Sequence, residues 1–159
     1  ATEDKTLHIL VGPPGAGKDT WLKDNLFNAH IISRDDILMD ISKGDTYTEK
    51  FKYAIENLEV NKEVDRQLQM VYNNASKTGN DVIINMTNMS AKSRKKWISN
   101  WVGKVKAYVF YTAYDELLYR NSVREGKIIK PYVINNMIKS FEYPKYSENI
   151  DEVEIVWSN

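Results

Sequence analysis

Gly12-Pro13-Pro14-Gly15-Ala16-Gly17-Lys18-Asp19-Thr20 is the stretch that decides how the rest of this sequence folds. An apolar run at 7–11 (Leu-His-Ile-Leu-Val) precedes it, and a helix-like run at 21–26 follows it. A glycine-rich turn that ends in lysine, between a strand and a helix, is typical of a loop that wraps a polyphosphate. Glycines let several backbone N–H groups point inward, and the next helix adds its positive dipole end. We therefore expect Lys18 to contact the outer phosphates of a nucleotide.

The predicted nucleotide-binding residues are those of this loop and the first turn after it: Gly12, Pro13, Gly15, Ala16, Gly17, Lys18, Asp19 and Thr20. The pattern normally places Ser or Thr directly after the lysine, where the hydroxyl binds Mg²⁺. Here Asp19 occupies that position and Thr20 comes next. A carboxylate beside phosphates is repulsive unless a cation lies between them, so either Asp19 reaches Mg²⁺ or Thr20 does. The alternative is an ordinary Gly/Pro turn between strand and helix.

Composition restricts the class of protein. A chain of 159 residues with 42% hydrophobic and 28% charged residues is typical of one soluble globular domain, here 1–159. The 22 basic and 22 acidic residues give no net charge, which argues against a broad basic surface for long nucleic acids but is compatible with a groove for a few nucleotides. The absence of cysteine excludes disulfides and thiolate catalysis and is compatible with a reducing cytoplasm. We expect no signal peptide and no membrane span.

Strand-like and helix-like segments alternate along the chain. The expected strands are 6–11, 30–32, 81–85, 105–111 and 152–157, and the expected helices are 18–27, a short one near 37–41, a long one at 46–77, 90–101, 112–124 and 132–140. This alternation predicts an α/β fold with a parallel sheet and right-handed crossovers. Ligands of such sheets bind outside the carboxyl ends of the strands. The loops at Gly12, Ser33, Met86 and Thr112 all follow a predicted strand.

Local patterns define several of these helices. Thr46 with Glu49, and Thr112 with Asp115, have the spacing of capping boxes, and Ser90 can cap the helix after it. Within the long helix, an apolar stripe predicts the buried face: Val64, Leu68, Val71 and Ala75.

Asp35 and Asp36 follow the second predicted strand. Phosphoryl transfer to a hydroxyl needs a carboxylate that accepts the hydroxyl proton beside an in-line phosphate. One of the two aspartates can serve this purpose while the other caps the next helix. The alternative is that both only cap that helix, where aspartate is favoured.

Other polar groups are candidates for the same site. Arg120 and Arg124, four residues apart, would share a helix face and clamp the β- and γ-phosphates, or else form a solvated face. Thr87 and Asn88 follow the third strand and can contact a nucleotide or form a plain turn. A basic helix face could guide a phosphate backbone, although a solvated face is favoured: Lys92, Arg94, Lys95 and Lys96. Some of the ten tyrosines and four tryptophans could stack on bases, but the pattern does not indicate which.

The order of these motifs resembles one family, the bacteriophage-type polynucleotide 5′-hydroxyl kinase domain of the P-loop kinase superfamily. The resemblance covers nearly the whole chain and is carried by Gly12–Lys18, Thr20-Trp21, Ser33-Arg34-Asp35-Asp36, Thr87-Asn88, a basic helix that ends in Trp97, and the run 120–127. It implies a three-layer sandwich with a parallel sheet of about four or five strands and a helical lid. It also implies ATP and Mg²⁺ as cofactors, a nucleic-acid end or a nucleotide-like substrate, and a cytoplasmic setting.

Carried over by position, the resemblance implies that Lys18 binds the ATP phosphates, Asp35 is the general base, and Arg124 contacts the transferring phosphate beside Arg120. Arg34, Asp35, Thr87 and Asn88 would bind the substrate. Three positions depart from the family pattern: Asp19 replaces a hydroxyl residue, Leu38 an arginine that contacts the acceptor's phosphate, and Met86 an acidic residue. The nucleotide half of the site is therefore better supported than the acceptor half.

The sequence thus predicts an ATP-dependent kinase that acts on the 5′-hydroxyl end of DNA or RNA. Two alternatives stay open. Leu38 favours a kinase of the same fold for another hydroxyl, on a nucleoside, a hydroxymethylated base in DNA or a small metabolite. Asp19 and Met86 both disturb the expected metal site, and they favour a nucleotide-binding module without catalysis.

Overall fold

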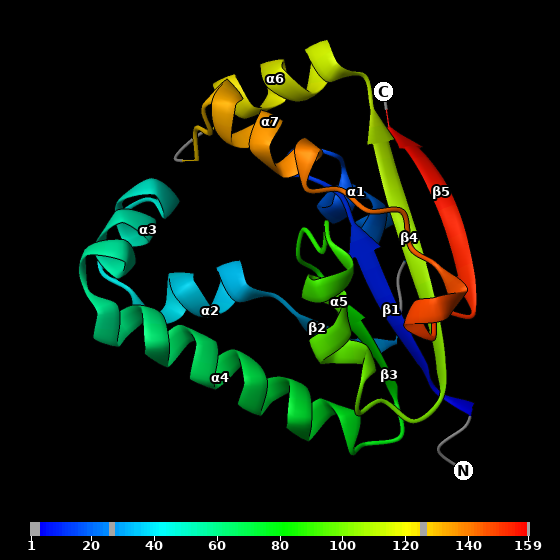
Figure 1. Ribbon diagram of the computed structural model, residues 1–159. Helices are drawn as coiled ribbons and strands as arrows, with labels where there is room; N and C mark the ends of the chain where they lie inside the picture. Colours follow the sequence, from blue (N-terminus) through cyan, green and yellow to red (C-terminus); the bar gives the residue numbers. More distant parts are fainter. Residues whose placement is uncertain (1–3, 26–27, 125–126, 159) are drawn as a thin grey trace.

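A parallel five-stranded sheet forms the centre of the protein (Figure 1). The computed structural model describes residues 4–25, 28–124 and 127–158. The strands lie in the order β2 (Ala29–Ile32), β3 (Asp81–Ile84), β1 (Thr6–Val11), β4 (Lys104–Thr112) and β5 (Glu152–Ser158). Every neighbouring pair is parallel, and the register pairs Leu7 with Val82 on one side and with Val105 on the other. The predicted α/β class with a parallel sheet is confirmed.

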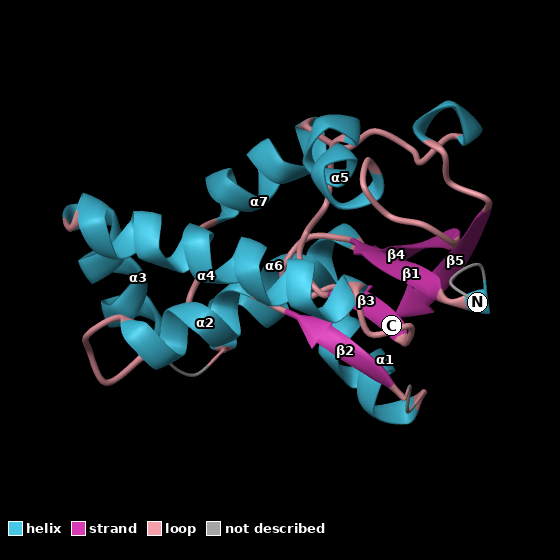
Figure 2. Ribbon diagram, turned by 90° about the horizontal axis from the view of Figure 1, so that it is seen from below, coloured by secondary structure: helices cyan, strands magenta, loops and turns pink. Residues whose placement is uncertain are grey.

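Helices cover both faces of the sheet (Figure 2). On one face, α4 (Leu58–Ser76) and α5 (Ala91–Ile98) pack over the larger core cluster, which includes the fully buried Leu7 and Ile9. On the other face, α1 (Lys18–Asp24) packs around Leu10 and Ile83, and α6 (Tyr114–Val123) and α7 (Pro131–Lys139) add Leu117 and Ile134 to the same cluster. Because β1 is central and covered on both faces, its residues are apolar at consecutive positions rather than at alternate ones.

The single long helix predicted for 46–77 is wrong. The chain forms α3 (Tyr47–Glu56) and α4, separated at Asn57, whose backbone is non-helical (φ −121°, ψ 89°) and whose amide donates to the Tyr53 carbonyl oxygen. Together with α2 (Arg34–Ile41), these helices enclose a third, smaller core cluster that contains the fully buried Leu38. The break therefore lets α3 turn back over α2, beside the carboxyl end of β2 (Figure 1).

The buried stripe of α4 also differs by one residue from the prediction. Val64, Leu68 and Ala75 are buried, but Val71 is 40% exposed and Tyr72 takes the expected position. Tyr72 donates a hydrogen bond to the Trp97 carbonyl oxygen and so joins α4 to α5.

The predicted cap at Ser90 is confirmed. Of the capping box predicted for Thr46 and Glu49 only the Thr46 half forms, because the Glu49 carboxylate accepts from the Asp45 N–H. Thr46 and Ser90 each accept a hydrogen bond from the backbone three residues later. The capping box at Thr112 is wrong because β4 extends through this residue, and its hydroxyl donates to the Ala16 carbonyl oxygen instead.

Several predicted ends shift. The helix predicted for 90–101 ends at Ile98, and the one predicted for 132–140 is α7. The first helix ends at Asp24 rather than at the predicted Phe27, which itself lies outside the described residues. No helix within the described ranges is both long and apolar enough to cross a membrane.

Candidate active site

The glycine loop joins β1 to α1 at the carboxyl edge of the sheet. Gly12 donates its N–H to the Thr87 carbonyl oxygen at 2.9 Å, which ties the loop to the turn after β3. Gly15 and Gly17 have positive φ angles of 83° and 94°, a region that residues with a Cβ rarely adopt. A Cβ on Gly15 would also lie 2.8 Å from the Asn121 amide nitrogen. Both glycines are therefore required by the path of the backbone.

Helix α6 holds the outer side of the loop. The Asn121 amide donates to the Pro14 carbonyl oxygen at 2.8 Å, and Arg120 donates to the Gly15 carbonyl oxygen at 2.9 Å and to the Ser158 hydroxyl at 3.0 Å. Arg120 and Arg124 do not share a helix face, because α6 ends at Val123 and Arg124 is extended (φ −66°, ψ 125°). This corrects the expectation drawn from their spacing, although both side chains still line one cleft.

A cleft of about 1020 Å³ opens in front of the loop. It is lined by most of the predicted site residues: Gly15, Gly17, Lys18, Asp19, Thr20, Arg34, Asp35, Thr87, Arg120 and Arg124. Gly12, Pro13 and Ala16 are buried on the other side of the loop. A cleft of this size lies at the upper end of the range for ligand sites, so it has room for a nucleotide and a second substrate.

Lys18 lies on the inner side of the loop. Its ammonium group donates to the Gly12 carbonyl oxygen and, at 3.5 Å, to the Met86 carbonyl oxygen. Burial lowers the pKa of Lys18 to about 7, against the raising effects of Asp19 and Asp35. The loop therefore holds a lysine whose charge is easily lost and which an added anion would stabilise.

Asp35 lies on the first turn of α2 and belongs to a cluster that sequence reasoning missed. Its carboxylate is 2.7 Å from the Lys127 ammonium group and lies near the Tyr47 hydroxyl, whose pKa it raises. The same ammonium lies 4.2 Å from the centre of the Tyr47 ring. Burial and then Asp35 raise the pKa of Tyr47, so this hydroxyl stays protonated. Lys127 belongs to the run 120–127, but its distance of 92 residues from Asp35 hides the pairing.

Asp36 differs from Asp35 in its surroundings. Its backbone N–H donates to the Ser33 hydroxyl at 3.4 Å, in the first turn of α2. Burial raises the pKa of Asp36, with further contributions from Asp19, Asp35 and Asp40. Ser33 thus caps the helix, and the two aspartates occupy its first turn, where their charge is favourable.

A family model described as an AAA domain, AAA_33, matches residues 7–144. The chain belongs to the AAA_33 family. Its fold is that of P-loop kinases. It is similar to a solved structure described as a "putative kinase" from Chloroflexus aurantiacus j-10-fl, with a TM-score of 0.63, 14% identity, and coverage of 99% of this chain and 87% of that one.

Two further solved structures share this fold. The unliganded sugar kinase from Janibacter sp. HTCC2649 has a TM-score of 0.64 at 15% identity, and the match covers 96% of this chain and 85% of that one. The gluconokinase from Sinorhizobium meliloti 1021 has a TM-score of 0.56 at 11% identity, with coverage of 98% and 83%. At these identities the likeness concerns the fold alone.

In this AAA_33 domain, Arg34 lines the cleft but is held by α4. Its guanidinium donates to the Asp65 carboxylate at 3.0 Å and to the Asn61 side-chain oxygen at 2.6 Å. Leu38 is fully buried in the cluster between α2 and α4, so it offers nothing to a bound substrate.

Asn88 does not line the cleft, contrary to the prediction. It is buried with a positive φ of 47°, and its amide donates to the carbonyl oxygens of Leu10, Ile84 and Met86. Asn88 therefore fixes the turn after β3, while Thr87, next to it, binds Gly12 through its carbonyl oxygen.

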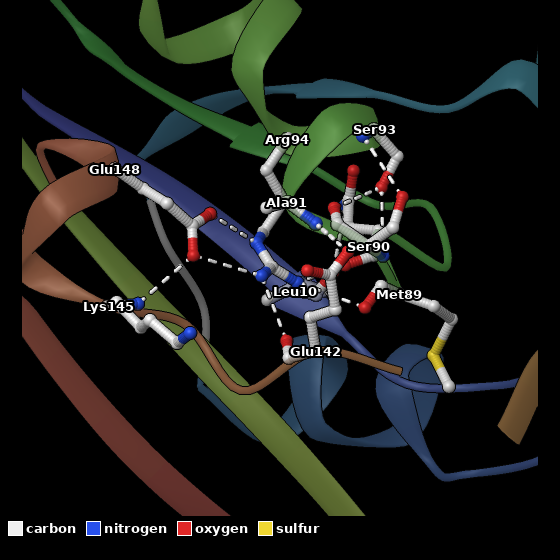
Figure 3. A network of polar contacts seen from close by, with 10 residues as sticks. Leu10, Met89, Ser90, Ala91, Ser93, Arg94, Glu142, Lys145 and Glu148 are labelled. Atoms are coloured by element: carbon white, nitrogen blue, oxygen red, sulfur yellow. Dashed lines mark hydrogen bonds and ion pairs between the residues drawn. The ribbon is translucent and has the colours of Figure 1, made fainter. Parts of the chain in front are cut away.

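Arg94 is fully buried, so it belongs to no basic or solvated helix face (Figure 3). Its guanidinium donates to the carbonyl oxygens of Asn88, Met89 and Glu142, and it pairs with the Glu148 carboxylate at 2.9 Å. The same network therefore supports the turn that carries Thr87, and through it the glycine loop.

The residues around the loop fit a Mg²⁺ ion. Asp19 and Thr20 both line the cleft, and Asp19 accepts a hydrogen bond from the Asn85 amide at 2.9 Å. Within the described residues, no three His, Cys, Asp or Glu side chains are grouped so as to hold a metal by themselves. Mg²⁺ in phosphoryl-transfer sites usually takes one or two protein ligands and completes its shell with phosphates and water. One carboxylate or hydroxyl here is sufficient for that role.

Proposed function

We propose that this protein is an ATP-dependent kinase that transfers the γ-phosphate to a hydroxyl group. The observation that carries the proposal is the position of Lys18 and Asp35, which line one cleft at the carboxyl edge of the sheet. They are close enough for the charge of Asp35 to raise the pKa of Lys18, although burial has the larger, opposite effect. A phosphate-binding lysine and a carboxylate in one cleft are the two groups that phosphoryl transfer to a hydroxyl needs.

Each group has a distinct part in the proposed reaction. The loop N–H groups and Lys18 hold the triphosphate, and Asp35 accepts the proton of the attacking hydroxyl. Arg124 also lies near both halves of the site, since its charge lowers the pKa of Lys18 and of Tyr47. In each case burial changes the pKa more than Arg124 does. Arg124 is therefore suited to stabilise the transferring phosphate. Mg²⁺ bound by Asp19 or Thr20 would neutralise phosphate charge. Catalysis then depends on positioning and electrostatics.

The acceptor we propose is the 5′-hydroxyl end of DNA or RNA. The order of motifs that resembles the polynucleotide kinase domain supports it, from the loop through Arg34-Asp35-Asp36 to the run 120–127. A small metabolite with a hydroxyl is the second candidate. It is favoured by the buried Leu38, which leaves no arginine at that position for an acceptor phosphate, and by the sugar kinase and gluconokinase among similar folds.

The proposal is tested by incubating the protein with γ-labelled ATP, Mg²⁺ and a short 5′-hydroxyl oligonucleotide, beside a panel of nucleosides and sugars. We expect label on the oligonucleotide. Asp35→Asn should reduce kcat about 10²–10⁴-fold, the usual contribution of a general base, and leave ATP affinity unchanged. Asp40→Asn, five residues later on α2 and outside the cleft, is the control. Label on a sugar alone would select the second candidate, and ATP binding without transfer to any acceptor would contradict a kinase.

A further inference from the structure

Helix α3 presents two aromatic side chains to the cleft. Tyr47 and Phe51 are one turn apart, and their rings are stacked with centroids 5.8 Å apart and planes at 18°. Both line the cleft, on the side of α2 and Asp35. No other ring pair in the described part of the chain has both members lining this cleft.

Tyr47 is held from three sides. The Asp35 carboxylate is near enough to raise the pKa of its hydroxyl, its ring lies under the Lys127 ammonium at 4.2 Å, and it packs on the cluster that contains Leu38. A ring constrained in this way has a fixed plane. The side chain that stacks on it is therefore positioned relative to the catalytic carboxylate.

Phe51 has no comparable structural role. It is 42% exposed, and it belongs to none of the three core clusters, unlike Tyr47, which packs on one of them. Its accessible ring atoms offer a flat apolar surface and no hydrogen-bonding group. Ile31, 51% exposed, and Met86 add apolar surface to the same cleft. Such a lining suits a planar, weakly polar group better than a polyol.

We propose that Phe51, supported by Tyr47, is the stacking platform for the nucleobase that carries the acceptor hydroxyl. The inference rests on the proposed kinase function and narrows its substrate class to a nucleoside or a nucleic-acid terminus. In a nucleoside the base is one sugar ring away from the 5′-hydroxyl, and in the cleft Phe51 is one aromatic ring away from the Asp35 carboxylate. A base on Phe51 thus directs its own 5′-hydroxyl toward Asp35. Base–aromatic stacking tolerates any sequence, as an end-specific enzyme requires.

The test measures binding rather than transfer. A short single-stranded oligonucleotide with a 5′-hydroxyl and a 3′-fluorescent label is titrated with the wild-type chain, Phe51→Ala, Phe51→Trp and Ile55→Ala, by fluorescence anisotropy. Ile55 is the matched control, because it lies on the same helix, is 62% exposed and does not line the cleft. We expect Phe51→Ala to weaken binding about 5- to 140-fold, the usual effect of losing one base–aromatic stack. Phe51→Trp and Ile55→Ala should bind as the wild type does.

A second oligonucleotide, abasic at its 5′-terminal residue, separates stacking from a general change of the cleft. We expect it to bind the wild type as weakly as Phe51→Ala binds the intact oligonucleotide, and to lose nothing further on Phe51→Ala. Equal binding of the intact oligonucleotide by wild type and Phe51→Ala would overturn the inference. So would a Phe51→Ala variant that weakens binding of the abasic oligonucleotide as much as binding of the intact one. A wild-type chain that does not bind the intact oligonucleotide would overturn it as well. Labelled transfer to a sugar with no oligonucleotide binding would overturn it while the kinase proposal stood.

Discussion

Lys127 and Asp35 form a 2.7 Å ion pair across the cleft, although they are 92 residues apart in the chain. Lys127 follows α6, which holds the glycine loop, and Asp35 lies in the first turn of α2, so the pair joins the nucleotide side of the site to the acceptor side. The Lys127 side chain is 16% exposed and that of Asp35 is 48% exposed. The pair is therefore partly screened by solvent, and we expect it to orient groups more than to stabilise the fold.

Replacing Lys127 with alanine tests whether the ion pair orients groups in the site more than it stabilises the fold. We expect the acceptor KM to rise about 3- to 10-fold with little change in the melting temperature, because a partly exposed pair contributes at most about 1 kcal/mol. Steady-state kinetics at low and high salt provide the measurement, and high salt should bring the wild type closer to the variant. Lys130→Ala, exposed on the same segment, is the control. A faster Lys127→Ala enzyme would instead mean that Lys127 blocks the base.

The lowered pKa of Lys18 predicts that ATP binding takes up protons. Because burial brings the pKa of Lys18 to about 7, much of this side chain is neutral above pH 7, and the triphosphate favours its charged form. Proton uptake should therefore increase from pH 6 to pH 8. Calorimetry in two buffers with different ionisation enthalpies measures it. We expect Lys18→Met to lose this uptake and all transfer activity, and Lys92→Met, at an exposed position of α5, to keep both.

The strands and the nucleotide loop were predictable because their signals are local. The run 6–11 matches β1, and the glycine spacing with Lys18 gave the loop. The break at Asn57 was not predictable, since no glycine or proline interrupts 46–77. It depends on packing against α2. The capping box at Thr112 failed for a similar reason, because pairing with β5 extends the strand to that residue.

Only those site residues that belong to a sequence motif were predictable. Asp35 follows a strand in a recognisable run, but its neighbours come from other elements, Tyr47 from the start of α3 and Lys127 from the connection between α6 and α7. Arg94 lies beside Lys95 and Lys96, so its pattern resembles an exposed face. Its burial depends on the segment that contains Glu142 and Glu148, which folds over it (Figure 3).

The position of Asp19 predicts how the site binds Mg²⁺. A carboxylate is a stronger Mg²⁺ ligand than a hydroxyl, and Asp19 lines the cleft directly after Lys18. Asp19→Asn should raise the Mg²⁺ concentration for half-maximal activity about tenfold, while Thr20→Val changes it less. Titrating Mg²⁺ at fixed ATP measures the effect, with Asp24→Asn at the far end of α1 as the control. A larger shift in Thr20→Val would assign the ion to the hydroxyl.

The buried Arg94 predicts the largest loss of stability. Arg94→Met leaves the mostly buried Glu148 carboxylate and three backbone carbonyl oxygens without this donor. Removing one partner of a buried ion pair typically lowers the free energy of unfolding by about 3–5 kcal/mol. For a chain of this length that corresponds to a fall in Tm of about 6–20 °C. Thermal unfolding followed by circular dichroism measures it.

Lys95→Met, exposed on the same helix, should change the free energy of unfolding by less than about 0.5 kcal/mol. Because Arg94 supports the turn whose Thr87 carbonyl oxygen binds Gly12, Arg94→Met should also weaken ATP binding at temperatures where the protein is still folded. Unchanged ATP affinity beside a lowered Tm would show that the network stabilises the domain without positioning the glycine loop. A lowered Tm together with weaker ATP binding in Arg94→Met, and no change in either quantity in Lys95→Met, would connect the buried network to the nucleotide site.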